Sequence, residues 1–124
     1  MPDIANNSYT RGQWAERVAL EFLKSKGLKL LEQNYRGPGG EIDLIMLDGK
    51  TIAFIEVRYR ANSNYADALE SIDSRKCSRI IKTGQLYLQN HPQAGETTFR
   101  FDVTTITGAT DKPGIEWIKN AFQA

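Results

Sequence analysis

The stretch that decides the fold is GEIDLIMLDGKTIAFIEVRYR, residues 40–60. Two apolar, β-branched runs at 41–47 and 51–59 flank the dipeptide Asp48-Gly49, which is typical of a tight turn between antiparallel strands. The stretch therefore predicts a β-hairpin. Charged residues interrupt both runs, so the same hairpin is the first place to look for a functional site.

Pairing across this hairpin brings charged side chains to one face. With a two-residue turn, Asp43 lies opposite Phe54. The same count places Glu41 opposite Glu56. Cross-strand partners share a face, as do residues two apart on one strand, and a slip of one residue would separate them. The predicted face carries Glu41, Asp43, Phe54, Glu56 and Arg58.

Acidic side chains in apolar strands need compensation. Two like charges about 5–6 Å apart repel by roughly 3 kcal/mol at an effective dielectric near 20, and partial burial adds a desolvation cost. Ion pairs with Arg58 or Arg100 would offset the repulsion in a purely structural role. A bound Mg²⁺ or Mn²⁺ would also offset it, because these cations take carboxylate oxygens and keep several waters. The hairpin by itself leaves both alternatives open.

Arg58 gives a reason to consider phosphate chemistry. It projects from the acidic face two residues beyond Glu56, and a cation beside paired carboxylates holds a phosphate or steadies a developing charge. Phosphodiester cleavage uses a metal-activated water, carboxylates that fix the metal, and a cation near the phosphorus. Glu16, on a helix before the sheet, would supply a further carboxylate.

Apolar periodicity and turn residues place the other elements. Apolar residues recur at helical spacing over 12–26, with Thr10 as the expected N-cap and Gly27 as the C-terminal stop. Residues 1–10 are polar and predict a flexible segment, which leaves 11–124 as a single domain. The remaining expected elements are a strand at 28–35, a loop at 36–40, a helix at 66–90, a strand at 99–107 and a short strand or helix at 115–122.

The order α-β-β-β-α-β predicts the α/β class, with a mixed sheet and flanking helices. A length of 124 residues with 40% hydrophobic residues suits one domain with a real core. The single cysteine, Cys77, excludes a disulfide within the chain and a zinc cage of cysteines, and we interpret it as a small core residue. Without a secretory signature or a membrane-spanning stretch, we expect a cytoplasmic protein with no membrane partner.

The net charge of +1 argues neither for nor against a nucleic-acid partner, so any basic surface must come from local clustering. Such a cluster lies in the second expected helix, where basic residues recur about one turn apart. With basic residues of the hairpin and its preceding loop, it predicts a phosphate-tracking surface, and the alternative is a solvated helix face. The predicted nucleic-acid-binding residues are Arg36, Arg60, Arg75, Lys76, Arg79 and Lys82.

Two other acids have structural interpretations. Glu41 is either a further metal ligand or a group that caps the sheet near Gly39-Gly40, and we favour the cap. Asp102 interrupts an apolar strand, and a structural pairing with Arg100 or a helix residue is favoured over catalysis.

The string GEIDLI at 40–45 followed by FIEVR at 54–58 resembles the core of PD-(D/E)XK nucleases, also called the restriction-endonuclease-like fold. With Gly12, Glu16, RFDV at 100–103 and IEWIKNAF at 115–122, nearly the whole chain after residue 10 resembles the bacterial YraN family. That family is labelled a predicted endonuclease related to archaeal Holliday-junction resolvases. The resemblance implies a restriction-endonuclease-like core.

The resemblance also implies roles for individual residues. Asp43 would be the central metal ligand and Glu56 the second, with the backbone carbonyl of Val57 completing the protein's share for Mg²⁺ or Mn²⁺. Glu16 would bind the metal directly or through water. Arg58 stands where the superfamily usually has lysine, and this is a departure. An arginine side chain stays protonated at physiological pH, so it cannot act as a base. It can still orient water or stabilise the transition state.

The function expected from the resemblance is metal-dependent endonucleolytic hydrolysis of phosphodiester bonds in DNA, including branched or junction DNA. One alternative is a nucleic-acid-binding module of the same fold without catalysis, which Arg58 in place of lysine favours. The other is an adaptor domain in which the acids form salt bridges. A homodimer is suggested by analogy alone, because junction resolvases cut two strands symmetrically.

Overall fold

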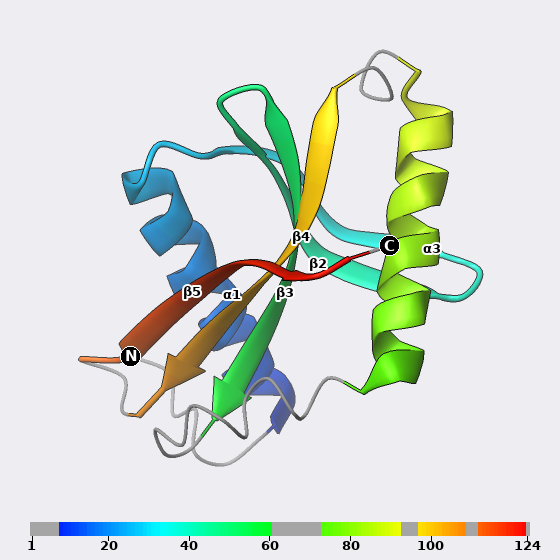
Figure 1. The fold of residues 1–124 in the computed structure, drawn as a ribbon. Helices are drawn as coiled ribbons and strands as arrows, with labels where there is room; N and C mark the ends of the chain where they lie inside the picture. Colours follow the sequence, from blue (N-terminus) through cyan, green and yellow to red (C-terminus); the bar gives the residue numbers. More distant parts are fainter. Residues whose placement is uncertain (1–7, 61–72, 93–96, 109–111, 124) are drawn as a thin grey trace.

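The computed structural model describes residues 8–60, 73–92, 97–108 and 112–123. One five-stranded sheet runs in the order β1-β2-β3-β4-β5, with β3 and β4 parallel and the other neighbours antiparallel (Figure 1). This confirms the predicted mixed α/β order and shows that the terminal element is a strand. The elements are α1 (Ser8–Ser25), β1 (Lys29–Gly37), β2 (Gly40–Asp48), β3 (Thr51–Arg60), α3 (Ser74–Asn90), β4 (Thr98–Thr107) and β5 (Gly114–Phe122).

The first helix begins earlier than predicted. α1 starts at Ser8, so Thr10 is not its N-cap and residues 8–10 are helical rather than flexible. No proline or glycine interrupts the chain between Ser8 and Arg11, which lets the first turn continue towards the N-terminus. The rest of the predicted flexible segment, residues 1–7, lies outside the described residues.

The second predicted helix, α3, starts at Ser74 because Asp73 caps it. The Asp73 side chain accepts a hydrogen bond from the Lys76 backbone N–H at 2.9 Å. The predicted stretch 66–72 lies outside the described residues. Cys77 is only partly buried in α3 and belongs to neither core cluster, so its interpretation as a core residue is wrong. None of the helices in the described part of the chain is both long and apolar enough to span a membrane.

The central hairpin has a different register from the one predicted. Asp48 pairs with Thr51, so the turn residues are Gly49 and Lys50. Gly49 has a φ of 62°, a value that glycine adopts without strain, and this explains why the turn is centred one residue later.

The corrected register moves the predicted partners by two residues. Phe54 lies opposite Ile45, so the predicted pairs Asp43–Phe54 and Glu41–Glu56 are wrong. A shift of two residues keeps every side chain on its predicted face, because the side-chain period of a strand is two. The charged side chains of the hairpin therefore still converge.

The helices α1 and α3 cover opposite faces of the sheet (Figure 1). Ala53 and Ile55 of β3 belong to the core cluster beneath α1. Ile52 and Phe54 belong to the cluster beneath α3. Glu56 continues this second series, so strand alternation directs its side chain to the α3 side.

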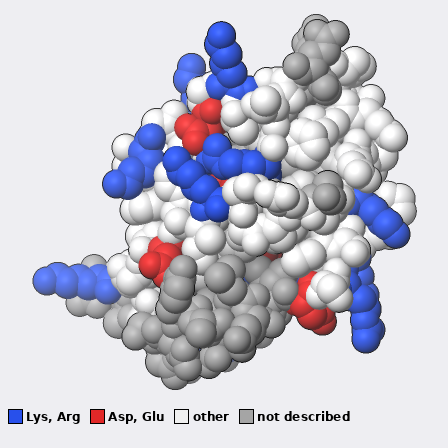
Figure 2. All heavy atoms as spheres, viewed as in Figure 1, with Lys and Arg blue, Asp and Glu red and all other residues white. Residues whose placement is uncertain are grey.

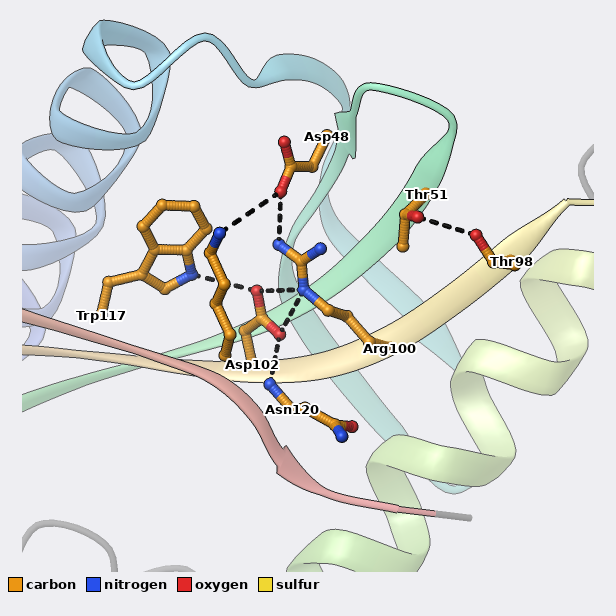
Figure 3. Close-up of polar contacts among 8 residues, drawn as sticks. Asp48, Thr51, Thr98, Arg100, Asp102, Trp117 and Asn120 are labelled. Carbon is orange, nitrogen blue, oxygen red and sulfur yellow. Dashed lines mark hydrogen bonds and ion pairs between the residues drawn. The ribbon is translucent and has the colours of Figure 1, made fainter.

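A buried carboxylate ties the edge strand β5 to β4 (Figure 3). Asp102 is fully buried and accepts hydrogen bonds from Arg100 Nε at 2.9 and 3.1 Å and from Trp117 Nε1 at 3.0 Å. The backbone N–H of Asn120 donates a further bond at 2.9 Å. Arg100 also reaches Asp48 through Nη2 at 2.8 Å. These contacts support the predicted structural role of Asp102.

Candidate functional site

The strands β2 and β3 separate at one end, and a cleft opens between them. Their pairing runs from the turn to Leu44 and Ile55. Beyond this point β2 continues along β1 and β3 continues along β4. The resulting space, here called the fork cleft, has a volume of about 370 Å³. Its lining consists of Gly12, Ala15, Glu16, Gly39, Gly40, Glu41, Asp43, Glu56, Val57, Arg58, Tyr59, Lys76, Arg79 and Ile80.

Close packing of a glycine brings the hairpin end to α3. A Cβ atom added at Gly40 would lie 3.2 Å from the Cβ of Arg79 and 3.6 Å from the Oγ1 of Thr83. A larger side chain would push the start of β2 away from the helix. The absence of a side chain at Gly40 therefore lets β2 and α3 bound the same cleft.

The side chain of Asp43 connects β2 to β3 at the point where the two strands separate. Its Oδ2 accepts a hydrogen bond from the Val57 backbone N–H at 2.8 Å, where the strands no longer pair with each other. Burial and then the charge of Glu56 raise the pKa of Asp43 well above its ordinary value of 3.8, and a hydrogen bond between the two carboxyl groups adds to this. The Val57 N–H opposes the rise in this pKa. The two carboxyl groups therefore interact directly.

Glu56 is 4% exposed and has two cations beside it. Lys76 Nζ lies 2.6 Å from Glu56 Oε2, and Arg58 Nη1 lies 3.8 Å from the same oxygen. The predicted partner Arg100 instead binds Asp48 and Asp102. Ion pairing, one of the two alternatives left open by the sequence, is therefore present at Glu56, and it is supplied mainly by Lys76.

Glu16 lies at the α1 side of the fork cleft. Burial first, then the charges of Glu41 and Glu56, raise its pKa above the ordinary 4.5. Within the described residues, no three or more His, Cys, Asp and Glu side chains are placed to hold one metal ion together. Asp43 interacts with Glu56 both through charge and through a hydrogen bond between the carboxyl groups. A pair is compatible with Mg²⁺, which is often held by one or two carboxylates and keeps several waters.

The remaining predicted site residues divide into two groups. Val57 and Arg58 line the fork cleft, and so do Lys76 and Arg79 among the predicted nucleic-acid-binding residues. Glu41 lines it too, but its Oε1 is paired with Arg36 Nε at 3.0 Å. These residues come from the hairpin strands β2 and β3 and from the helix α3.

The other basic residues do not line the fork cleft. Lys82 lines a separate hollow with Pro38 and Leu86, Arg75 is exposed near the start of α3, and Arg60 ends β3. On the face in Figure 2, basic and acidic side chains are interspersed. The predicted basic surface is therefore concentrated in the cleft at Arg58, Lys76 and Arg79, rather than along the whole of α3.

The contact between Lys76 and Glu56 was missed by sequence reasoning, which placed Lys76 on an exposed basic face. A signal was present, because Lys76 precedes the buried Ile80 by four residues and so lies on the same side of the helix. A long side chain from that position reaches the sheet.

Comparisons with known proteins identify the family of this chain. The model of the family described as "Uncharacterised protein family UPF0102" matches residues 15–106, which include Glu16, Asp43 and Glu56. A UPF0102 protein of Stutzerimonas stutzeri is 44% identical over 96% of this chain and 99% of its own length. A UPF0102 protein of Pseudomonas putida strain GB-1 is 46% identical over 90% of this chain and 92% of its own length. A UPF0102 protein of Methylococcus capsulatus is 43% identical over 91% of this chain and 90% of its own length. The chain therefore belongs to the UPF0102 family, the YraN family that its motifs predicted.

Proposed function

We propose that this protein is a metal-dependent endonuclease that hydrolyses phosphodiester bonds in DNA, with branched or junction DNA as the favoured substrate. The observation that carries the proposal is the pair of interacting carboxyl groups of Asp43, which is half-buried, and Glu56, which is buried; both line an open cleft and have cations near them. The preference for branched DNA comes from the resemblance to junction resolvases.

The distribution of charge favours a divalent cation at this pair. Lys76 and Arg58 offset the charge of Glu56, yet the pKa of Asp43 remains raised by burial and by Glu56. Asp43 is hydrogen-bonded to the Val57 N–H and to the Glu56 carboxyl, but within the described residues no lysine or arginine forms a salt bridge with it. A cation of charge two would satisfy both carboxylates at once, and oxygen ligands suit Mg²⁺ or Mn²⁺.

The residues of the fork cleft then have distinct roles. Asp43 and Glu56 hold the metal, with the Val57 carbonyl as a third protein ligand and Glu16 acting through a water. The metal supplies polarisation of the phosphate and increased acidity of water. Arg58 contributes a permanent charge that binds a phosphate oxygen and stabilises charge that develops in the transition state.

The DNA backbone would be held by basic residues in and around the cleft. Arg79 faces the cleft, whereas Arg36, Arg60, Arg75 and Lys82 extend around it and would contact phosphates further along the strands. Cutting both strands of a junction symmetrically would need a homodimer. A cytoplasmic location is part of the proposal.

A nucleic-acid-binding module without catalysis is the second candidate. Arg58 favours it, because a guanidinium cannot take a proton from water as a neutral lysine can. Such a module would use the fork cleft to bind phosphates, and its metal would serve binding only.

Incubation of the protein with four-way-junction, flap and linear duplex DNA in Mg²⁺ or Mn²⁺ separates the candidates. We expect cleavage that requires the metal, is strongest on branched DNA and is lost in Asp43→Asn. Glu41→Gln is the matched control, because it removes one negative charge from the cleft rim where Arg36 already pairs with it. Metal-dependent binding without cleavage of any substrate supports the module. If the protein shows no binding and no cleavage, both candidates are refuted.

A further inference from the structure

The ion pair between Lys76 and Glu56 is unusually asymmetric in its exposure. The Lys76 side chain is 38% exposed and that of Glu56 is 4% exposed, with 2.6 Å between Nζ and Oε2. The backbone of Lys76 is anchored by its hydrogen bond to the Asp73 side chain, which caps α3. The helix therefore has a fixed start, while a long and partly exposed side chain delivers the ammonium group to the buried carboxylate.

The position of the ammonium conflicts with a metal ligand role for Glu56. Lys76 Nζ occupies Oε2 of Glu56, so a metal bound to either oxygen of this carboxylate would lie within a few ångströms of the ammonium, and the two cations would repel each other. Arg58 is further from this oxygen, at 3.8 Å, so it conflicts less with a metal. Binding of a metal at Asp43 and Glu56 therefore favours movement of Lys76 away from Glu56.

We propose that Lys76 is the resident counter-cation of Glu56, that a divalent metal displaces it, and that the displaced ammonium then binds a phosphate of the nucleic acid. This inference rests on the proposed metal site. It assigns Lys76 a positioning role before metal binding and a substrate-binding role afterwards, in addition to general attraction of DNA.

In the fork cleft the released ammonium could bind a phosphate. Lys76 lines the cleft together with Arg58 and Arg79, so three positive charges surround the same space. Once the metal neutralises Glu56, the anion that these charges attract most strongly is a phosphate in the cleft. Metal binding and substrate binding are then coupled, because the first step frees a group used in the second.

Calorimetric titration of Mn²⁺ into the protein without DNA tests the displacement. Lys76→Gln removes the competing charge at similar length, and we expect it to bind Mn²⁺ about tenfold more tightly than wild type. Lys82→Gln is the matched control, since Lys82 is on the same helix but lines a different hollow. Its Mn²⁺ affinity should equal that of wild type, and Lys76→Arg, which keeps the charge, should not tighten binding.

The second step is tested by binding of a four-way-junction DNA in Ca²⁺ and in EDTA. Lys76→Gln should weaken binding about fivefold to tenfold in Ca²⁺ and much less in EDTA, where Lys76 is held by Glu56. Thermal denaturation checks that the variant folds, and Lys76→Met replaces it if it does not.

The outcomes distinguish this inference from the metal site itself. Mn²⁺ binding in wild type that is lost in Asp43→Asn but unchanged or weakened in Lys76→Gln refutes the exchange and leaves the metal site intact. No Mn²⁺ binding in either wild type or Lys76→Gln refutes both. Binding that appears only in Lys76→Gln supports the exchange in its strongest form.

Discussion

Replacement of Asp43 by asparagine should stabilise the metal-free protein, although it removes a residue of the proposed site. At neutral pH the wild-type protein either ionises the half-buried Asp43 carboxyl beside Glu56 or keeps it protonated well above its ordinary pKa of 3.8, and both states cost free energy. Asparagine has no charge to bury. Its side-chain oxygen still accepts the hydrogen bond that Val57 N–H gives to Asp43.

The size of the effect follows from two opposing contributions. Two like charges about 5 Å apart repel by roughly 3 kcal/mol at an effective dielectric of about 20. Loss of the charge weakens the Val57 hydrogen bond by about 1 kcal/mol. We therefore expect Asp43→Asn to raise the free energy of unfolding by about 2 kcal/mol, which is roughly 6–10 °C in Tm for a chain of this length.

The pH dependence of this difference has a definite sign. Because the folded state raises the pKa of Asp43, it binds more protons than the unfolded state above pH 3.8, so wild-type stability falls as pH rises through this window. The gap between Asp43→Asn and wild type should therefore be small near pH 4 and reach its full size above the folded-state pKa. Glu16, whose pKa is also raised, repels Asp43, so the loss of this repulsion is part of the gap between the two proteins.

Thermal and urea denaturation in EDTA between pH 4 and pH 8 measure this gap. Glu41→Gln serves as the control, and because its ion pair with Arg36 is solvent-exposed, its stability should change by less than about 1 kcal/mol. An Asp43→Asn variant that is no more stable than wild type at pH 7.5, or a gap that does not widen with pH, would refute the reasoning about the paired acids.

Three further substitutions test other parts of the structure. Arg58→Met should lower DNA cleavage by about 100-fold or more with little change in Mn²⁺ affinity, as measured by initial rates and calorimetry, because it removes the permanent charge near the phosphate. Asp102→Ala should cost about 3–5 kcal/mol in urea denaturation, since it removes the buried acceptor of the Trp117 N–H and leaves the half-buried Arg100 guanidinium with Asp48 alone. Gly84→Ala should lower stability by about 1–2 kcal/mol in the same assay, because the new Cβ would lie 3.1 Å from the Phe101 ring.

Local sequence signals were sufficient for most of the fold. Alternation and turn residues located the central hairpin. The assignment of its side chains to the two faces of the sheet was correct despite the wrong register, because the true pairing differs by two residues. The position of Gly49 within the turn depends on backbone angles that the dipeptide Asp48-Gly49 does not specify. The start of α1 depends on how far the helix continues past Thr10, which propensity determines only weakly.

The candidate site was predictable in its acids but not in its counter-ions. Asp43 and Glu56 stand out because charge is rare in apolar strands, and parity alone brings them together. The partner of Glu56 depends on how α3 packs across the opening between β2 and β3, which is a tertiary property. For this reason Arg100 was a plausible partner in the sequence, whereas Lys76 is the partner in the structure.

Anomalous diffraction from crystals of the protein containing Mn²⁺ tests the metal site most directly. We expect one strong anomalous peak in the fork cleft, about 2.1 Å from carboxylate oxygens of both Asp43 and Glu56, with the Lys76 ammonium moved away from Glu56. A cleft without a peak at saturating Mn²⁺, with Lys76 still bound to Glu56, would contradict the metal site and the proposed endonuclease with it.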